Sequence, residues 1–240
     1  MAAEKSKKRG LARPLIIIFA LALALGLATG VYAGTYSRAD AEAVAAFSEA
    51  NKEDGAYSFG SSDVGLIFYP GGKVEYSAYA PLAKRISEEA VITCIVAKMP
   101  LNLAVFDADA AKDIIAARPE VGSWYIGGHS LGGAMAASFA AKNPDMIAGV
   151  ALLAAYSTEP LAMPVISIYG ELDTVLNAEK YEECRANLPE GCQELMIPGG
   201  NHALFGNYGG QKGDSTAKIT AAEQQEAAAK AIAAWLATLE

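Results

Sequence analysis

The sequence has few histidines, few cysteines and few charged residues. Only two histidines and three cysteines occur in 240 residues, and no two cysteines are spaced as Cys-x-x-Cys. This scarcity argues against a zinc site or another Cys/His cluster, so we expect no metal and no cofactor. Charged residues make up 19% of the chain and the net charge is −8, which argues against nucleic-acid binding.

Apolar residues are abundant instead. They make up 52% of the chain, alongside 23 glycines and 10 prolines. This composition excludes a disordered or collagen-like protein, and the length fits one domain of ordinary size.

The N-terminus differs from the rest in charge. Residues 1–13 carry five basic side chains and one acidic one, and residues 14–37 carry no charge. A helix rises about 1.5 Å per residue, so the second segment could span a hydrocarbon core of roughly 30 Å. We predict a basic cytoplasmic segment over 1–13 and a transmembrane anchor over 14–37, which makes a single-pass cell-membrane protein with an extracytoplasmic C-terminal domain. The alternative is a cleaved secretory signal with Val31-Tyr32-Ala33 as its cleavage site, which gives a secreted protein.

Export permits disulfides. Cys184 and Cys192 are eight positions apart, at the expected end of a helix and start of a strand, so their pairing is left open. Cys94 lies in the apolar run AVITCIVA and is predicted to be a buried hydrophobic residue.

From Val64 onward, apolar runs alternate with helical patterns. The predicted strands are 64–69, 90–97, 123–128, 148–155, 164–170 and 193–197, and the predicted helices lie near 76–89, 108–118, 131–142, 177–187 and 221–240. Such alternation predicts a mainly parallel sheet buried on both faces, hence one three-layer α/β domain over 64–240. Residues 38–63 are interpreted as a linker containing a short helix and one edge strand. Only residues 156–163 separate two of the strands, which leaves no room for a lid domain.

The strongest catalytic signal is the stretch GGHSLGG at 127–133. It places a Gly-x-Ser-x-Gly motif between a predicted strand and a predicted helix. On such a tight turn Ser130 would project from the carboxyl end of the sheet, and the N–H of Leu131 would point toward a developing oxyanion. The alternative is a glycine-rich turn with an idle serine.

A serine nucleophile needs a base and an orienting acid. His129 adjoins Ser130 at the strand end, so its side chain should point elsewhere, which leaves His202 in the loop after the last strand. The acid should follow the strand PVISIYG, where Asp173 is the candidate and Glu171 the alternative.

The loop after the strand VGLIFY is the candidate for the second oxyanion donor. We predict the N–H of Gly72 as this donor and Lys73 as the alternative, because the register is uncertain by one residue. Tyr69 could place a hydroxyl near the site, and Asn102 lies in the apolar stretch 99–107, so Tyr69, Lys73 and Asn102 are the predicted substrate contacts. The alternative for residues 99–107 is packing beneath the sheet edge.

Five stretches carry a resemblance to a known family: LIFYPGGKVEYSAYAPLA (66–83), KMPLNLAVFD (98–107), GGHSLGGAMAASFA (127–140), IYGELDTV (168–175) and GGNHALFGNYGGQKGD (199–214). From about Val64 to Glu240 the chain resembles the α/β-hydrolase superfamily, and more narrowly a bacterial group of membrane-tethered α/β-hydrolase-fold proteins. The resemblance implies an α/β-hydrolase fold with Ser130 as nucleophile, Asp173 as acid and His202 as base. Many relatives have His-Gly where this chain has Pro70-Gly71.

The prediction is a serine hydrolase that cleaves a carboxylic ester or related acyl substrate, either a small molecule or lipid-like, through an acyl-enzyme at Ser130. One alternative is an acyltransferase of the cell envelope that uses the same triad. The other is a non-catalytic exported binding module, in which Ser130 and His202 would be dispensable.

Overall fold

The computed structural model describes residues 14, 16–21, 23, 24, 26, 30–32, 34–53 and 55–239. The chain divides into two compact units, Met1–Tyr36 and Ser37–Glu240. The predicted basic segment, the predicted cleavage site at Ala33 and parts of the predicted anchor lie outside the described residues. Within the described part, no helix combines the length and the apolar character that crossing a bilayer requires.

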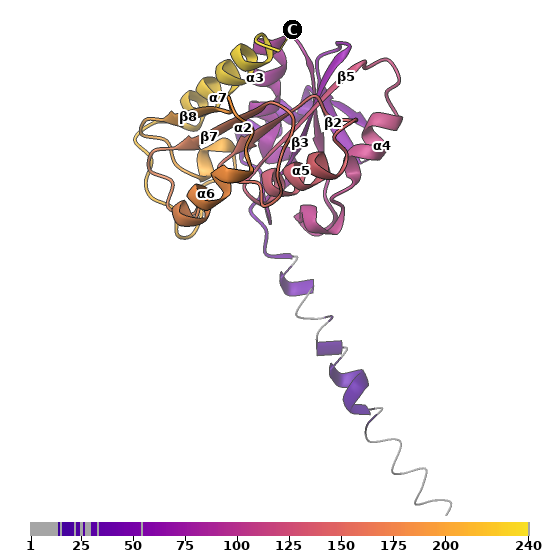
Figure 1. The fold of residues 1–240 in the computed structure, drawn as a ribbon. Helices are drawn as coiled ribbons and strands as arrows, with labels where there is room; N and C mark the ends of the chain where they lie inside the picture. The colour runs from indigo at the N-terminus through magenta and orange to yellow at the C-terminus, as the bar shows by residue number, and fades with distance from the viewer. Residues whose placement is uncertain are drawn as a thin grey trace, which may run out of the picture. The chain divides into compact units, whose positions relative to one another are not determined.

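The second unit is built on an eight-stranded sheet, which Figure 1 shows with helices on both of its faces. Its strand order is β1-β2-β4-β3-β5-β6-β7-β8. The pairs β1/β2 and β2/β4 are antiparallel and the other pairs are parallel, so the predicted mainly parallel sheet is confirmed. The strands are β1 (Asn51–Glu53), β2 (Ala56–Phe59), β3 (Val64–Tyr69), β4 (Thr93–Ala97), β5 (Ser123–His129), β6 (Gly149–Leu153), β7 (Val165–Gly170) and β8 (Gln193–Ile197).

The helices occupy the stretches that the sequence predicts. The α-helices are α2 (Ala41–Ser48), α3 (Ala80–Ala90), α4 (Ala110–Ala116), α5 (Leu131–Lys142), α6 (Ala178–Cys184) and α7 (Ala221–Leu236). The short 3₁₀ turns are η1 (Tyr76–Tyr79), η2 (Pro100–Asn102), η3 (Ala104–Phe106), η4 (Arg185–Asn187) and η5 (Ala203–Phe205). Residues 154–164 join β6 to β7 without a helix, as the short connection predicts.

Two apolar clusters cover the two faces of the sheet. Side chains alternate along a strand, so Leu66 and Phe68 of β3 pack with residues of α3 and α7, and Ile67 and Tyr69 pack with residues of α4 and α5. This alternation produces the predicted three layers.

The folded unit begins at Ser37, earlier than the predicted boundary at Val64. Helix α2 is capped by Asp40, whose side chain accepts a hydrogen bond from the N–H of Ala43 at 2.9 Å. Strand β2 is buried and pairs with β4, so residues 38–63 belong to the domain and contribute two strands in place of one. The four residues of β2 are too few to show a clear pattern in the sequence.

The three cysteines are free thiols, so Cys184 and Cys192 are not paired. Cys94 is buried in β4 as predicted. Burial raises the pKa of the Cys94 thiol well above its usual value, which keeps it neutral and unreactive.

Candidate active site

Ser130 lies on the turn between β5 and α5. Its backbone has φ 53° and ψ −124°, a conformation that L-residues rarely adopt, and its N–H donates to the carbonyl oxygen of Leu153 at 2.9 Å. A Cβ on Gly132 would lie 2.2 Å from the carbonyl oxygens of Tyr69 and Pro70, so only glycine lets the helix approach β3 this closely. The turn therefore holds the serine at the carboxyl end of the sheet, where it is partly exposed.

His202 and Asp173 form a buried pair. Nδ1 of His202 lies 2.8 Å from Oδ2 of Asp173, and both side chains are 2% exposed. The other carboxylate oxygen, Oδ1, accepts the N–H groups of Val175 and Leu176, each at 2.8 Å. Because an ionised carboxylate only accepts, Nδ1 of His202 carries the proton, and Nε2 of the neutral ring can accept one.

Side-chain hydrogen bonds fix the loop that carries His202. Gln224 of α7, which is fully buried, accepts from the N–H of Asn201 at 2.9 Å and donates to its carbonyl oxygen at 2.8 Å. The carboxylate of Glu171 accepts the N–H of Gly199 at 2.8 Å. Glu171, the alternative acid, therefore holds the loop of His202, and the carboxylate at the imidazole ring belongs to Asp173.

Ser130 and His202 line one cavity of about 260 Å³ at this edge of the sheet. Nε2 of His202 is buried and has no hydrogen-bond partner in the part of the chain that the structure describes, so it is available to a proton from the serine. Contacts between nucleophile and base are often long without substrate and shorten when it binds. The other lining residues are Leu131, Ala134, Ala154, Ala155, Tyr156, Val175, Leu176 and Asn177.

Gly72 and Leu131 lie side by side at the site. A Cβ on Gly72 would be only 2.9 Å from Cδ2 of Leu131. The N–H of Lys73 donates to the carbonyl oxygen of Asn102 at 2.7 Å, so the alternative donor is already used. The geometry therefore favours the N–H groups of Gly72 and Leu131 as the candidate oxyanion donors.

The predicted substrate contacts do not line the cavity that holds Ser130. Tyr69 is fully buried, and its hydroxyl donates to the carbonyl oxygen of Ala108 at 3.0 Å and accepts from the N–H of Ala111 at 2.9 Å. Its side chain packs on the α4 and α5 face, which corrects the prediction of a hydroxyl near the site. Lys73 and Asn102 both have positive φ, 59° and 55°, and their backbones join the 99–107 stretch to the glycine loop.

The sequence argues against His129 as the base, but it does not predict the contacts that the ring of His129 makes. Its buried ring has its centroid 4.6 Å from that of His202, and its Nδ1 lies 2.8 Å from the hydroxyl oxygen of Tyr79. Burial lowers the pKa of His129 well below its usual value, so its ring is neutral. The cavity residues 154–156 were also missed, although they follow β6 at the carboxyl edge, where strand-end reasoning points.

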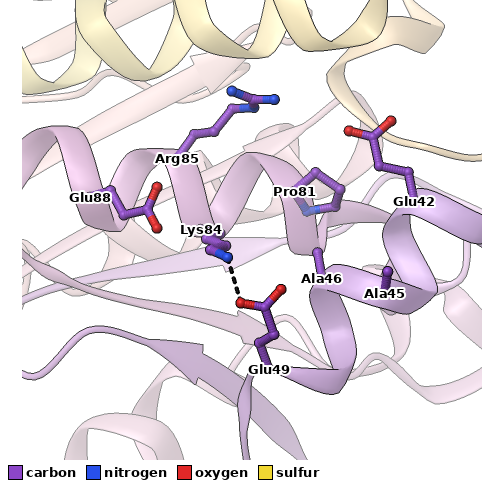
Figure 2. A pocket seen from close by; sticks show the side chains of 8 residues that line it. All are labelled: Glu42, Ala45, Ala46, Glu49, Pro81, Lys84, Arg85 and Glu88. Atoms are coloured by element: carbon purple, nitrogen blue, oxygen red, sulfur yellow. Dashed lines mark hydrogen bonds and ion pairs between the residues drawn. The ribbon is translucent and has the colours of Figure 1, made fainter.

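A larger cavity, of about 380 Å³, lies between α2 and α3 (Figure 2). Charges of both signs line it: Nζ of Lys84 lies 2.6 Å from the Glu49 carboxylate, and Glu42, Arg85 and Glu88 surround the pair. No histidine or serine is among its lining residues that the structure describes, so the smaller cavity at Ser130 is the candidate active site. Among the described residues, no group of three or more His, Cys, Asp or Glu side chains could hold a metal ion.

Comparisons with known proteins give a family and a set of solved structures of the same fold. The model of the alpha/beta hydrolase family matches residues 65–226, and no curated protein matches. Est1E from Butyrivibrio proteoclasticus, solved with ferulic acid bound, is 14% identical with a TM-score of 0.59 over 77% of this chain and 94% of that one. A thermophilic esterase from Thermogutta terrifontis is 14% identical, with a TM-score of 0.59 over 77% of this chain and 93% of that one. A membrane phospholipase A, described as a bacterial virulence factor, is 12% identical, with a TM-score of 0.61 over 97% of this chain and 99% of that one.

At these identities the likeness to the solved structures is one of fold. The narrower resemblance to membrane-tethered members stays a prediction.

Proposed function

This chain belongs to the α/β-hydrolase family, and we propose that it is a serine hydrolase that cleaves carboxylic esters through an acyl-enzyme at Ser130. One observation carries the proposal: His202, whose Nδ1 lies 2.8 Å from Oδ2 of the buried Asp173 side chain, lines the same cavity as Ser130, a serine with a positive φ of 53°. The esterase from Thermogutta terrifontis has the same fold and acts on esters by its name, which is consistent with this chemistry.

In this reaction Oγ of Ser130 attacks the ester carbonyl carbon while Nε2 of His202 takes its proton. Asp173 stabilises the resulting imidazolium through Nδ1, and the N–H groups of Leu131 and Gly72 donate to the tetrahedral oxyanion. The bond to the leaving oxygen then breaks, and His202 gives its proton to the alcohol. Water, deprotonated by His202, attacks the acyl-enzyme in the same manner, releases the carboxylic acid and restores the hydroxyl of Ser130.

The lining of the cavity supports a proposal for the substrate class. Among the lining residues that the structure describes there is no lysine, arginine, aspartate or glutamate, and three of them are the alanines Ala134, Ala154 and Ala155. A charged acyl group would lose its hydration here without gaining a partner, which is costly. The volume of about 260 Å³ lies below the usual range for drug-sized ligands of roughly 300–1,000 Å³. We therefore expect short, uncharged acyl groups to be preferred.

The cellular location is a second part of the proposal and rests on sequence. The uncharged run 14–37 behind a basic start would anchor the protein, with the hydrolase domain outside the cytoplasm. Fractionation of cells and protease treatment of intact cells test this. A protein that stays in the soluble cytoplasmic fraction would contradict it.

A fluorophosphonate probe tests the mechanism directly. The full-length protein is labelled and the modified residue is identified by mass spectrometry, alongside Ser130→Ala, His202→Ala and the control Ser138→Ala, a serine on α5 that hydrogen-bonds to Glu159. We expect labelling at Ser130 that is lost in Ser130→Ala, falls strongly in His202→Ala and is unchanged in the control. A folded protein that is not labelled would refute the serine mechanism and favour a binding module.

Turnover of p-nitrophenyl acetate, butyrate and octanoate then tests the substrate class. The shortest acyl groups should give the highest kcat/KM. A variant that narrows the cavity, Ala134→Leu on α5, should lower the rate with butyrate more than the rate with acetate. If added alcohols compete with water for the acyl group at millimolar concentrations, the enzyme is an acyltransferase.

A further inference from the structure

A buried set of polar contacts lies behind the candidate active site, between the glycine loop and the base. The N–H of Gly71 donates to the hydroxyl oxygen of Tyr79 at 3.0 Å, and that oxygen lies 2.8 Å from Nδ1 of His129. The ring of His129 in turn packs against the ring of His202, with centroids 4.6 Å apart. Tyr79 and His129 are 0% and 1% exposed, so these contacts are shielded from water.

The direction of each hydrogen bond can be assigned. A backbone N–H only donates, so the Tyr79 oxygen accepts from Gly71 and directs its own hydrogen elsewhere. Among the described residues, Nδ1 of His129 is the acceptor at hydrogen-bond distance from this hydroxyl, which assigns the proton of the neutral imidazole to Nε2, a buried atom with no hydrogen-bond partner in the same part of the chain. Burial raises the pKa of Tyr79 and lowers the pKa of His129, so both groups stay neutral and the assignment holds across the physiological pH range.

Gly71 fits this arrangement because it has no side chain. A Cβ there would lie 2.6 Å from the Tyr79 hydroxyl oxygen and 2.8 Å from Nδ1 of His129. The next residue is Gly72, the oxyanion donor of the proposed reaction, and the planar peptide between them couples their positions. A shift of Gly71 therefore moves the N–H of Gly72.

We propose that Tyr79 and His129 are positioning residues of this enzyme. The Tyr79 hydroxyl holds Gly71 so that the N–H of Gly72 faces the oxyanion, and His129 orients that hydroxyl while its ring supports the ring of His202. The inference rests on the proposed ester hydrolysis, because only that reaction creates the oxyanion. Neither residue lines the cavity, so neither contacts the substrate.

The test compares variants of the full-length protein with p-nitrophenyl acetate as the substrate. Tyr79→Phe removes only the hydroxyl, and His129→Phe keeps an aromatic ring but removes the acceptor. Each should lower kcat by about 10- to 100-fold with KM changed by less than about threefold, because misplacement of an aligned group acts on the transition state. The kcat of the double variant should be no more than about twofold below that of the less active single variant, because the two side chains act as one unit.

Tyr57→Phe is the matched control. It also removes a fully buried hydroxyl that donates to a backbone carbonyl, that of Tyr76 at 3.0 Å, but in the described part of the chain this hydroxyl makes no hydrogen bond to the glycine loop. Its kcat should equal that of the wild type, whatever happens to its thermal stability. His129→Gln, which restores an acceptor, should recover part of the activity lost in His129→Phe, and this pair decides the question if Tyr79→Phe does not fold.

A Tyr79→Phe variant with wild-type kcat would overturn the proposal. A double variant whose loss in kcat equals the product of the two single losses would overturn it as well. A loss of stability in Tyr79→Phe without a loss of kcat would also overturn it, because that is the result of a purely structural role. These outcomes are distinct from failure of the proposed function, which would appear as a folded wild type that neither turns over the ester nor labels at Ser130.

Discussion

Ser130→Gly should be more stable than Ser130→Ala, although both variants lack the hydroxyl of the proposed nucleophile. The backbone at Ser130 has φ 53° and ψ −124°, and such a conformation costs a residue with a Cβ about 1–3 kcal/mol. Glycine avoids this cost but loses about 0.5–1 kcal/mol through the greater freedom of the unfolded chain. Both variants keep the backbone hydrogen bond to Leu153, so the difference isolates the strain. The net gain of Ser130→Gly over Ser130→Ala is therefore about 1 kcal/mol.

Urea unfolding and calorimetry of the two full-length variants measure this gain. For a folded unit of this size, about 1 kcal/mol corresponds to a rise of roughly 2–4 °C in Tm. The control is Ala45→Gly on the exposed side of α2, which should instead lose about 1 kcal/mol because its backbone is helical. If Ser130→Gly is no more stable than Ser130→Ala, the turn carries no strain and this reasoning is wrong.

Three further predictions concern the site and its surroundings. Asp173→Asn should lower kcat for p-nitrophenyl acetate by about 10⁴ with an unchanged circular dichroism spectrum, because an amide favours the wrong tautomer of His202; a loss below tenfold would contradict the assigned role. Below its ordinary pKa of 6.5, His129 binds a proton in the unfolded chain that it does not bind when folded, because burial lowers its folded pKa. The free energy of unfolding should therefore fall on acidification by up to about 1 kcal/mol per pH unit. Urea unfolding at pH 7 and 5.5 measures this fall, which should be smaller in His129→Phe. Gly132→Ala should unfold at a lower Tm than Gly210→Ala, because a Cβ at the first position meets two carbonyl oxygens at 2.2 Å and one at the second meets no atom within 4 Å; equal Tm values would contradict the close approach.

The fold was predictable where one element has a continuous pattern. The apolar runs 64–69 and 193–197 coincide with β3 and β8, and the helical pattern 131–142 coincides with α5. The strand predicted over 90–97 is β4 in the structure and begins three residues later, at Thr93. Helix α3 continues to Ala90, and Val91 turns the chain at φ 55°. That turn depends on how α3 packs, which a local pattern does not contain.

The candidate site was predictable only to the level of the loop. Strand ends of a parallel sheet meet at one edge, so the positions of Ser130, Asp173 and His202 in the sequence sufficed to select them. The direction of a side chain at a strand end depends on the face it occupies, which is why Tyr69 was assigned to the site although it packs against α4 and α5. The contact between Tyr79 and His129 joins residues 50 positions apart, and no local pattern indicates it.

The choice between Glu171 and Asp173 shows what the structure adds. Both acids follow β7, and the sequence alone kept both as candidates. The short side chain of Asp173 places Oδ1 against two N–H groups of its own turn, and this fixes Oδ2 toward Nδ1 of His202. The longer side chain of Glu171 reaches Gly199, three residues before the histidine. The two carboxylates thus act on the same proposed base, His202, in different ways. Asp173 contacts its ring and Glu171 holds the loop that carries it, and the difference follows from the length of each side chain and from the local turn.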